Sequence, residues 1–424
     1  MILWIGLVWR VRWANPNRLG ALFVAEESRL RSQDEDSRID WGIIFSVMML
    51  GLIGLASIYV AAVHDSSSVN VTKQVISQVM WFVIGTAIAV IVMQFDSEQL
   101  WRVAPIAYWF GIFLLAAVLV LYSRSLFAST GAKSWFAVGS LTLQPSEVMK
   151  PAFILMLGRV VTMHNTEHPT HTMASDWQLI GKLIAYMVPV AILLKLQNDF
   201  GTMLVFFAIL GGVILVSGIS WRLLAPTFAI VAAIAGTALY LVISQSGRHI
   251  LEAIGFKQYQ FARIDTWLNP STDTSNNAYQ VWQSMKAIGS GQITGRGFNV
   301  SHVTVPVRES DMIFSVIGEN FGFIGCAVVI LLYFLLIYQM IRVTFDTKNE
   351  FYAYISTGVI MMILFHVFEN IGMSIGLLPM TGIPLPFISQ GGSALIANMA
   401  GIGLMMSMRY HYKSYMFSRN DRFE

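Results

Sequence analysis

A polar stretch from Gly247 to Asp311 interrupts an otherwise apolar chain. It contains the run Asn269-Pro270-Ser271-Thr272-Asp273, a glycine-rich run from Gly289 to Gly297, and a charged cluster that begins at Arg308. Glycines permit a backbone to approach a ligand closely, although they also mark turns. Charged groups beside membrane-embedded helices are expensive and are mostly retained for function, although a cluster at a helix end can simply mark the membrane interface. The stretch is therefore the predicted working surface.

A second group of polar residues surrounds the predicted start of a helix at Pro145. Proline suits the first turn of a helix, and the carboxylate of Glu147 suits the positive end of the helix dipole. One interpretation is a capped helix end with a local pair between Glu147 and Lys150. The other is functional and puts Lys133 and Lys150 near an anionic ligand.

Asp199 lies in the tight link Gln197-Asn198-Asp199-Phe200-Gly201-Thr202 between two apolar runs, with Lys195 close in sequence. A carboxylate at membrane depth must be paired, bind a cation or become neutral. A salt bridge with a lysine and a catalytic role both remain open. A divalent ion such as Mg²⁺ or Mn²⁺ is a third hypothesis, because carboxylate and carbonyl oxygens suit hard cations.

A proline- and glycine-rich connection near the C-terminal end leads into another predicted helix. Its last residues are Ser389-Gln390-Gly391-Gly392-Ser393. The free amides of a helix N-terminus bind anions, so this connection could meet a phosphate or could only cap its helix. His366 and Glu369 are three residues apart on the preceding helix and share a face. We interpret them as a satisfied polar pair between helices.

The composition describes a membrane protein. Of 424 residues, 55% are hydrophobic and only 12% are charged, and the mean hydropathy is +0.62. The net charge of +3, spread over many loops, does not indicate a nucleic-acid partner. The single cysteine, Cys326, excludes an intrachain disulfide and a thiolate zinc cluster.

Ten apolar runs are long enough to be helices that cross a membrane, where every backbone amide needs a partner within the chain. The predicted fold class is therefore all-α, with one membrane domain over residues 41–409. The ten runs are Trp41 to Val63, Gln74 to Phe95, Trp101 to Tyr122, Ser146 to Met163, Trp177 to Leu196, Gly201 to Ser217, Leu223 to Ile243, Met312 to Val343, Phe351 to Leu378 and Ser393 to Met408.

An even number of spans predicts that both termini lie on one side, and the basic residues select the side. Residues 1–40 and 410–424 are rich in arginine and lysine, so we predict that both tails are cytoplasmic. The stretch 247–311, between the seventh and eighth helices, is then predicted to lie on the extracytoplasmic side of the membrane. The lysines and arginines within it do not oppose this orientation, because the charge rule applies to short loops.

Taken together, these motifs resemble the shape, elongation, division and sporulation family of bacterial cell-wall polymerases, the RodA branch more than the FtsW branch. The resemblance extends from Trp41 to Arg409 and rests on five separated motifs. They are Gly131-Ala132-Lys133 with Gln144-Pro145-Ser146-Glu147, Gln197 to Thr202, Tyr279-Gln280 with Gln283-Ser284, Ser310-Asp311 with Gly318-Glu319-Asn320, and Pro384 to Ser393.

The resemblance implies a ten-helix peptidoglycan glycosyltransferase that polymerises lipid II on the outer face and works with a class B penicillin-binding protein, a transpeptidase, in the elongation machinery. It assigns the catalytic acid or base to Asp273. The chain departs from the family pattern at Thr274, Asn276, Ala278 and Gln390. From the motifs and from the cations around them, we predict the substrate-binding residues Lys133, Glu147, Lys150, Asp199, Arg263, Tyr279, Gln280, Arg308, Ser389, Gly391 and Gly392.

The chemistry fits one carboxylate, which takes a proton from an attacking sugar hydroxyl. A diphosphate leaving group needs cations rather than an acid, and Lys133, Lys150, Arg263, Arg308 or a divalent ion could supply them. Two other functions remain open. The charges at membrane depth would also suit a lipid II flippase, and a scaffold for cell-wall enzymes would need only docking faces.

Overall fold

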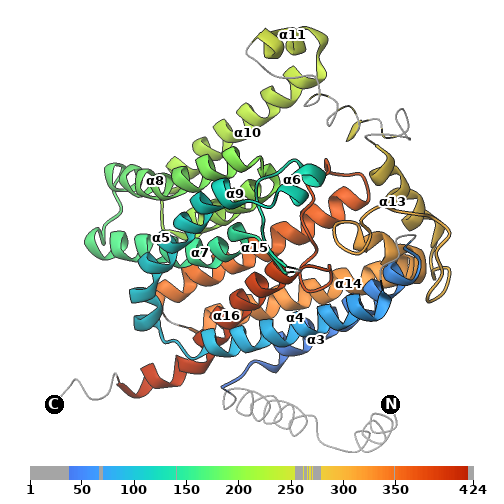
Figure 1. Ribbon diagram of the computed structural model, residues 1–424. Helices are drawn as coiled ribbons and strands as arrows, with labels where there is room; N and C mark the ends of the chain where they lie inside the picture. The colour runs from blue at the N-terminus through green and yellow to red at the C-terminus, as the bar shows by residue number, and fades with distance from the viewer. Residues whose placement is uncertain are drawn as a thin grey trace, which may run out of the picture.

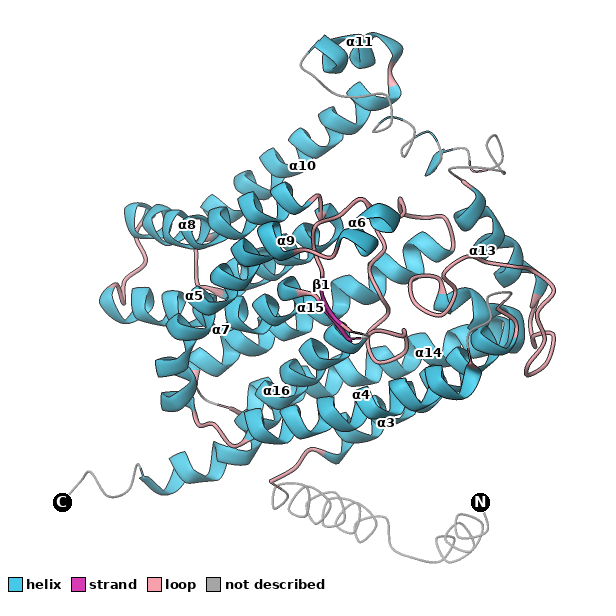
Figure 2. Ribbon diagram, viewed as in Figure 1, coloured by secondary structure: helices cyan, strands magenta, loops and turns pink. Residues whose placement is uncertain are grey.

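The computed structural model describes residues 38–65, 70–139, 141–253, 261, 265, 267–268, 270, 278–347 and 349–418. These residues are mostly helical, with one short hairpin of antiparallel strands that pairs Phe136 with Leu143 and Val138 with Leu141 (Figure 2). The elements are α3 (Trp41–Val63), α4 (Val71–Met93), α5 (Ser97–Leu121), α6 (Arg124–Thr130), β1 (Phe136–Val138), β2 (Leu141–Leu143), α7 (Pro145–Glu167), α8 (Met173–Gln197), α9 (Phe200–Val216), α10 (Trp221–Ile243), α11 (Gln245–Ala253), α13 (Tyr279–Ser290), α14 (Ile313–Asp346), α15 (Glu350–Ser374) and α16 (Gly392–Ser418).

All ten predicted apolar helices are present, as α3, α4, α5, α7, α8, α9, α10, α14, α15 and α16. Among the described residues, seven helices are long and apolar enough to cross a membrane. The other three are α9, which is apolar but only 17 residues long, and α7 and α16, which carry more polar side chains. The all-α prediction is confirmed.

Polar side chains end several of these helices at the expected places. Asp96 and Gln99 form a capping box at the start of α5, in which each side chain bonds the other's backbone amide. Asn198 ends α8 in the left-handed conformation, with φ of 62°, and Asp199 caps α9 directly afterwards. The link between α8 and α9 is therefore tight, and Asp199 has a defined position.

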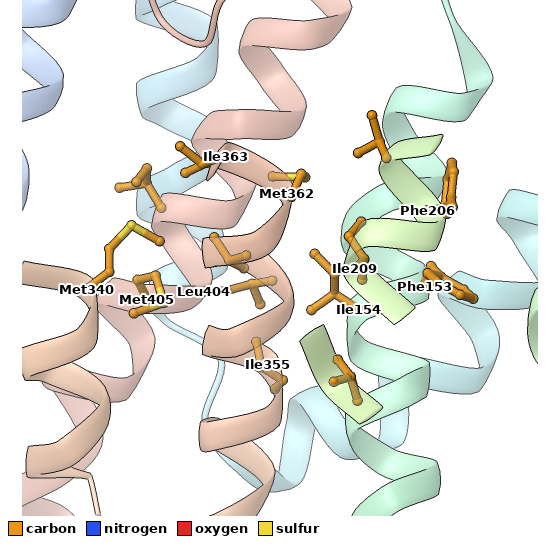
Figure 3. Close-up of a cluster of buried hydrophobic side chains, with 14 of the residues drawn as sticks. Phe153, Ile154, Phe206, Ile209, Met340, Ile355, Met362, Ile363, Leu404 and Met405 are labelled. Atoms are coloured by element: carbon orange, nitrogen blue, oxygen red, sulfur yellow. The ribbon is translucent and has the colours of Figure 1, made fainter. Parts of the chain in front are cut away.

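Helix α15 is the centre of the bundle and packs against α7, α9, α14 and α16. Figure 3 shows its side chains Ile355, Met362 and Ile363 among apolar side chains of those helices. These three side chains are fully buried. Because α15 contacts four helices, its polar residues are held in a rigid environment.

Glycines bring α13 and the turn after it against α14. A Cβ at Gly291 would collide with the carbonyl oxygen of Gly318, and one at Gly295 would collide with the carbonyl of Asn320. Gly322 breaks the helical geometry of α14, with φ of 62° and ψ of −157°. Gly291 and Gly295 of the glycine-rich run therefore serve close packing within the protein.

Helix α10 has a different environment from the other long helices. Its buried residues are Leu223 and Leu224, both near its start, and the rest of the helix extends away from the bundle towards α11 (Figure 1). It leads directly into the polar stretch that begins at Gly247. The polar stretch therefore begins at the end of a helix that is packed against the bundle only near its own start.

Candidate active site

The connection between α15 and α16 is bonded to the end of the polar stretch. The Ser389 hydroxyl donates to the Ser310 carbonyl at 2.6 Å and accepts from the Leu385 amide at 2.8 Å. The Gln390 amide donates to the Glu309 carbonyl at 2.9 Å. The end of the polar stretch and the α15–α16 connection, which are 79 residues apart in the sequence at this bond, therefore form one surface.

Asp311 lies at this junction. The Asn370 side chain on α15 donates to the carbonyls of both Asp311 and Ile383, each at 2.8 Å. The Ser310 hydroxyl donates to the Asp311 carboxyl at 3.1 Å, and Gly382 lies against that carboxyl. Burial raises the pKa of Asp311 to about 6. The sequence placed Asp311 in a family motif but did not select it as a site residue, because its burial depends on Asn370 and Gly382.

Asp199 joins the starts of α7 and α9. Its carboxylate accepts from the Gln144 side-chain amide at 3.0 Å and from the Thr202 backbone amide at 3.2 Å. The Gln144 backbone amide in turn donates to the hydroxyl of Ser393 at the start of α16, at 3.1 Å. Asp199 thus connects helices at the same end of the bundle as the Ser389 junction.

Of the alternatives that the sequence left open for Asp199, a salt bridge with Lys195 is not found between these two described residues, and Lys195 is exposed. Both Asp199 oxygens accept hydrogen bonds from protein donors. Within the described ranges, no group of three histidine, cysteine or carboxylate side chains gathers around Asp199. Among the described residues, the Asp199 carboxylate is therefore held by protein hydrogen-bond donors, with no second and third ligand of these types beside it.

Lys150 and Glu147 form the predicted pair on α7, with 2.8 Å between Nζ and Oε1, and both side chains are at most 4% exposed. Lys150 Nζ is also 2.9 Å from His366 Nε2 on α15. His366 therefore bonds Lys150, whereas Glu369 lies beside Thr381 in the α15–α16 connection. Glu147, Lys150 and His366 thus form a group inside the bundle that links α7 to α15.

Lys133 has a different environment. Its backbone amide donates to the Gln197 carbonyl at 2.9 Å, which brings it to the α8–α9 link. Its ammonium lies over the rings of Tyr122 and Phe127, at 5.1 and 5.8 Å from the ring centres. In the part of the chain that the structure describes, no carboxylate lies within 4.0 Å of this ammonium. Its charge is available to an anion.

Arg308 is buried, and its Nη1 donates to the Ser301 hydroxyl at 2.6 Å. Burial lowers the pKa of the Arg308 guanidinium, and the carboxylates of Glu319, Asp65 and Glu309 oppose this effect. Glu319 itself accepts from the backbone amides of His302 and Val303. Arg308 is therefore buried in the last part of the polar stretch beside α14, rather than exposed at a membrane interface.

Some of the remaining predicted site residues are among the described residues, and two are not. Tyr279 and Gln280 begin α13, and the Gln280 side chain donates to the Pro306 carbonyl at 3.3 Å. Gly392 is packed so closely against the Trp81 ring that a Cβ would collide with it, whereas a Cβ at Gly391 would meet little. Asp273 and Arg263 lie outside the described residues.

The long apolar helices and the polar junctions at one end define a multi-pass membrane protein. The chain matches the FtsW, RodA and SpoVE family model, described as a cell cycle protein, over residues 38–414, and it belongs to that family.

Relatives and solved structures agree with this assignment. The chain is 31% identical over 377 residues to the peptidoglycan glycosyltransferase MrdB of Escherichia coli (strain K12), covering 86% of this chain and 93% of that protein. It is 28% identical over 395 residues to the probable peptidoglycan glycosyltransferase FtsW of Alkalilimnicola ehrlichii, covering 91% and 92%. It also resembles a chain from "Structural coordination of polymerization and crosslinking by a peptidoglycan synthase complex", with a TM-score of 0.70, 27% identity, and coverage of 89% and 98%.

Proposed function

We propose that this protein is a peptidoglycan glycosyltransferase that polymerises lipid II at the outer face of the bacterial cytoplasmic membrane. The observation that carries the proposal is the family match over residues 38–414, together with relatives of similar length that are named peptidoglycan glycosyltransferases. Both tails are cytoplasmic in this proposal, and the stretch 247–311 faces outwards.

Asp273 is the proposed general base. It takes the proton from the sugar hydroxyl that attacks the anomeric carbon of a second sugar, and this assistance is typically worth about 10² to 10⁴ in rate. The bond to the lipid diphosphate breaks as the new glycosidic bond forms. Attack from the face opposite the diphosphate inverts the configuration of that carbon, and a single carboxylate suffices because the diphosphate leaves without protonation.

The diphosphate is stabilised by cations in this proposal. Lys133 is the best supported, because its ammonium is at a link between helices and has no described carboxylate partner. Arg263 is a second candidate, because it supplies a positive charge within the same polar stretch as Asp273. Lys150 and Arg308 act less directly, since each is buried and already bonded to protein groups, and they hold the surrounding backbone in position.

The proposed partner is a class B penicillin-binding protein, the transpeptidase that crosslinks the new strands during elongation. The structural neighbour from a peptidoglycan synthase complex supports such a partner. The MrdB relative supports the elongation branch, while the FtsW relative of comparable identity makes a division enzyme the second candidate within the family.

The proposal is tested with purified protein, lipid II and the transpeptidase partner, with and without chelator. Asp273→Asn should lower glycan formation by at least about 10²-fold, because the proton acceptor is lost. Glu252→Gln is the matched control, since Glu252 is an exposed acid of the same outer segment and should leave polymerisation unchanged. Near-normal polymer from Asp273→Asn would contradict the assignment.

A flippase is the second candidate, because Lys150, Glu147 and His366 place polar groups inside the bundle. In reconstituted vesicles, movement of labelled lipid II across the bilayer without chain growth would favour transport. Chain growth that Asp273→Asn abolishes would favour the polymerase.

A further inference from the structure

A histidine-rich segment lies at the C-terminal end of α7 and is not used by the proposed reaction. Three of the chain's eight histidines, His164, His168 and His171, fall within eight residues, and Glu167 lies among them. Since α7 begins at the Asp199 junction and has 23 residues, its end is about 33 Å from that junction. Any role of this segment is therefore separate from the polymerase site.

His164, Glu167 and His168 each offer one possible ligand atom, and these three atoms lie within 4.8 Å of one another. His164 is fully buried, His168 is half-buried and Glu167 is exposed. Two imidazoles and one carboxylate form a donor set that suits first-row transition metals such as Zn²⁺, whereas Mg²⁺ prefers oxygen ligands only. A fourth position would remain open to water.

The hydrogen bonds around the two histidines leave a ring nitrogen of each able to bind a cation. Lys182 Nζ lies 3.3 Å from His164 Nδ1, and an ammonium can only donate, so Nδ1 carries the lone pair. His164 Nε2 then donates to the Ser175 hydroxyl at 3.1 Å. His168 Nδ1 lies 3.3 Å from the His164 carbonyl, so it donates and leaves Nε2 with its lone pair. In metal sites, a hydrogen bond from the ring nitrogen that does not bind the metal orients the histidine in this way.

The Lys182 ammonium already stands where a cation would bind. Besides its contact with His164, it lies 3.5 Å from a Glu167 oxygen. The lysine side chain is 41% exposed, so its flexible stem can move into solvent. We propose that His164, Glu167 and His168 bind one divalent transition-metal ion, and that the Lys182 ammonium holds this position in the metal-free protein. His171 is excluded because it is paired with Asp176.

The test uses the full-length protein in detergent, purified without a polyhistidine tag, with Zn²⁺ or Co²⁺ as the probe. Zn²⁺ affinity is measured by competition with a chromophoric chelator, and Co²⁺ coordination by its visible absorption. One ion per chain is expected. His168→Gln and Glu167→Gln should each weaken binding by at least about tenfold, because each removes a ligand. Lys182→Met should tighten binding by about tenfold, because it removes a competing positive charge.

His411→Gln is the matched control, because His411 lies near the far end of α16 and is not part of the three-ligand group. All four substituted side chains are at least partly exposed, and gel filtration checks that each variant stays folded. The metal site is overturned if wild type and Lys182→Met bind no more Zn²⁺ than the Glu167→Gln/His168→Gln double variant. Unchanged affinity in Lys182→Met would overturn the role of the lysine.

Discussion

Lys150 is a charged side chain held inside the bundle by two neighbours, Glu147 on its own helix and His366 on α15. Removing one charge of a buried pair leaves the other without compensation, which commonly costs about 3 to 5 kcal/mol. Lys150→Met should therefore lower the free energy of unfolding by an amount in this range. The measurement is thermal unfolding in detergent, followed by tryptophan fluorescence.

The Glu147→Gln/Lys150→Met double variant is the control for this prediction. It removes both charges, so it should recover much of the stability lost in Lys150→Met. If the double variant is as unstable as the single one, the loss comes from packing and not from an unpaired carboxylate.

Asp311 should make stability depend on pH. Its pKa is raised to about 6, above its usual value, so the folded protein holds this proton more tightly than the unfolded chain does. Its contribution to stability is fully present below the usual carboxyl pKa and is lost as the pH rises through about 6. Asp311→Asn cannot ionise and still accepts from Ser310.

The melting temperature of Asp311→Asn should therefore exceed that of the wild type by about 1 to 4 °C at pH 7.5. The difference between the two proteins should shrink at pH 4.5, where the wild-type carboxyl is protonated in the folded state. A difference that is the same at both pH values would show that ionisation of Asp311 is not its source.

The sequence predicts single contacts on one helix better than contacts between helices. The Glu147–Lys150 pair was predicted and is confirmed, because residues three apart on a helix are neighbours. The bond from Lys150 to His366 joins positions 216 residues apart, and no local pattern reveals it. The sequence interpretation of His366 and Glu369 as a satisfied polar pair between helices is confirmed for His366, which bonds Lys150 on α7. Glu369 instead bonds Thr381 in the connection between α15 and α16.

The ten apolar helices could be predicted from the sequence because a membrane-spanning helix requires a long run of apolar residues. The ends of these helices were predicted less accurately than their presence. Helix α16, for example, continues to Ser418, ten residues past the predicted Met408. The short elements α6, α11 and α13 and the β1–β2 hairpin lie in polar connections without a long apolar run, so they were not predicted.

Gly322 gives a prediction about α14. Its φ of 62° and ψ of −157° are accessible almost only to glycine, and a Cβ there would collide with the backbone of Gly295. Gly322→Ala should lower the free energy of unfolding by about 2 kcal/mol or more, since both strain and collision are added. Thermal unfolding measures the change.

Gly236→Ala is the matched control for Gly322→Ala. Gly236 lies in α10, where nothing is within 4 Å of a Cβ, and alanine favours a helix over glycine by up to about 1 kcal/mol. The control should be neutral or slightly stabilising. Equal losses in the two variants would contradict the special geometry assigned to Gly322.

The proposed orientation of the whole chain in the membrane can be measured by cysteine labelling. Cys326 is only 9% exposed, so a cysteine introduced on the surface should dominate labelling in intact cells. His249→Cys, in α11, should react with a membrane-impermeant maleimide from outside. Glu98→Cys, at the start of α5, should react only after the membrane is permeabilised.

Both positions are well exposed, with His249 at 84% and Glu98 at 73%, so a difference in labelling reports the side of the membrane. The reverse pattern would put the stretch 247–311 in the cytoplasm. Lipid II polymerisation on the outer face by that stretch would then be impossible.

The weak support of α10 has a mechanical consequence. This helix is about 35 Å long, is buried only near its start, and contains Pro226 close to that start, where the missing backbone hydrogen bond eases bending. A tilt of about 5° at the base would displace the far end by about 3 Å. Such a lever converts a small movement at one surface of the bilayer into a repositioning of the segment above the opposite surface.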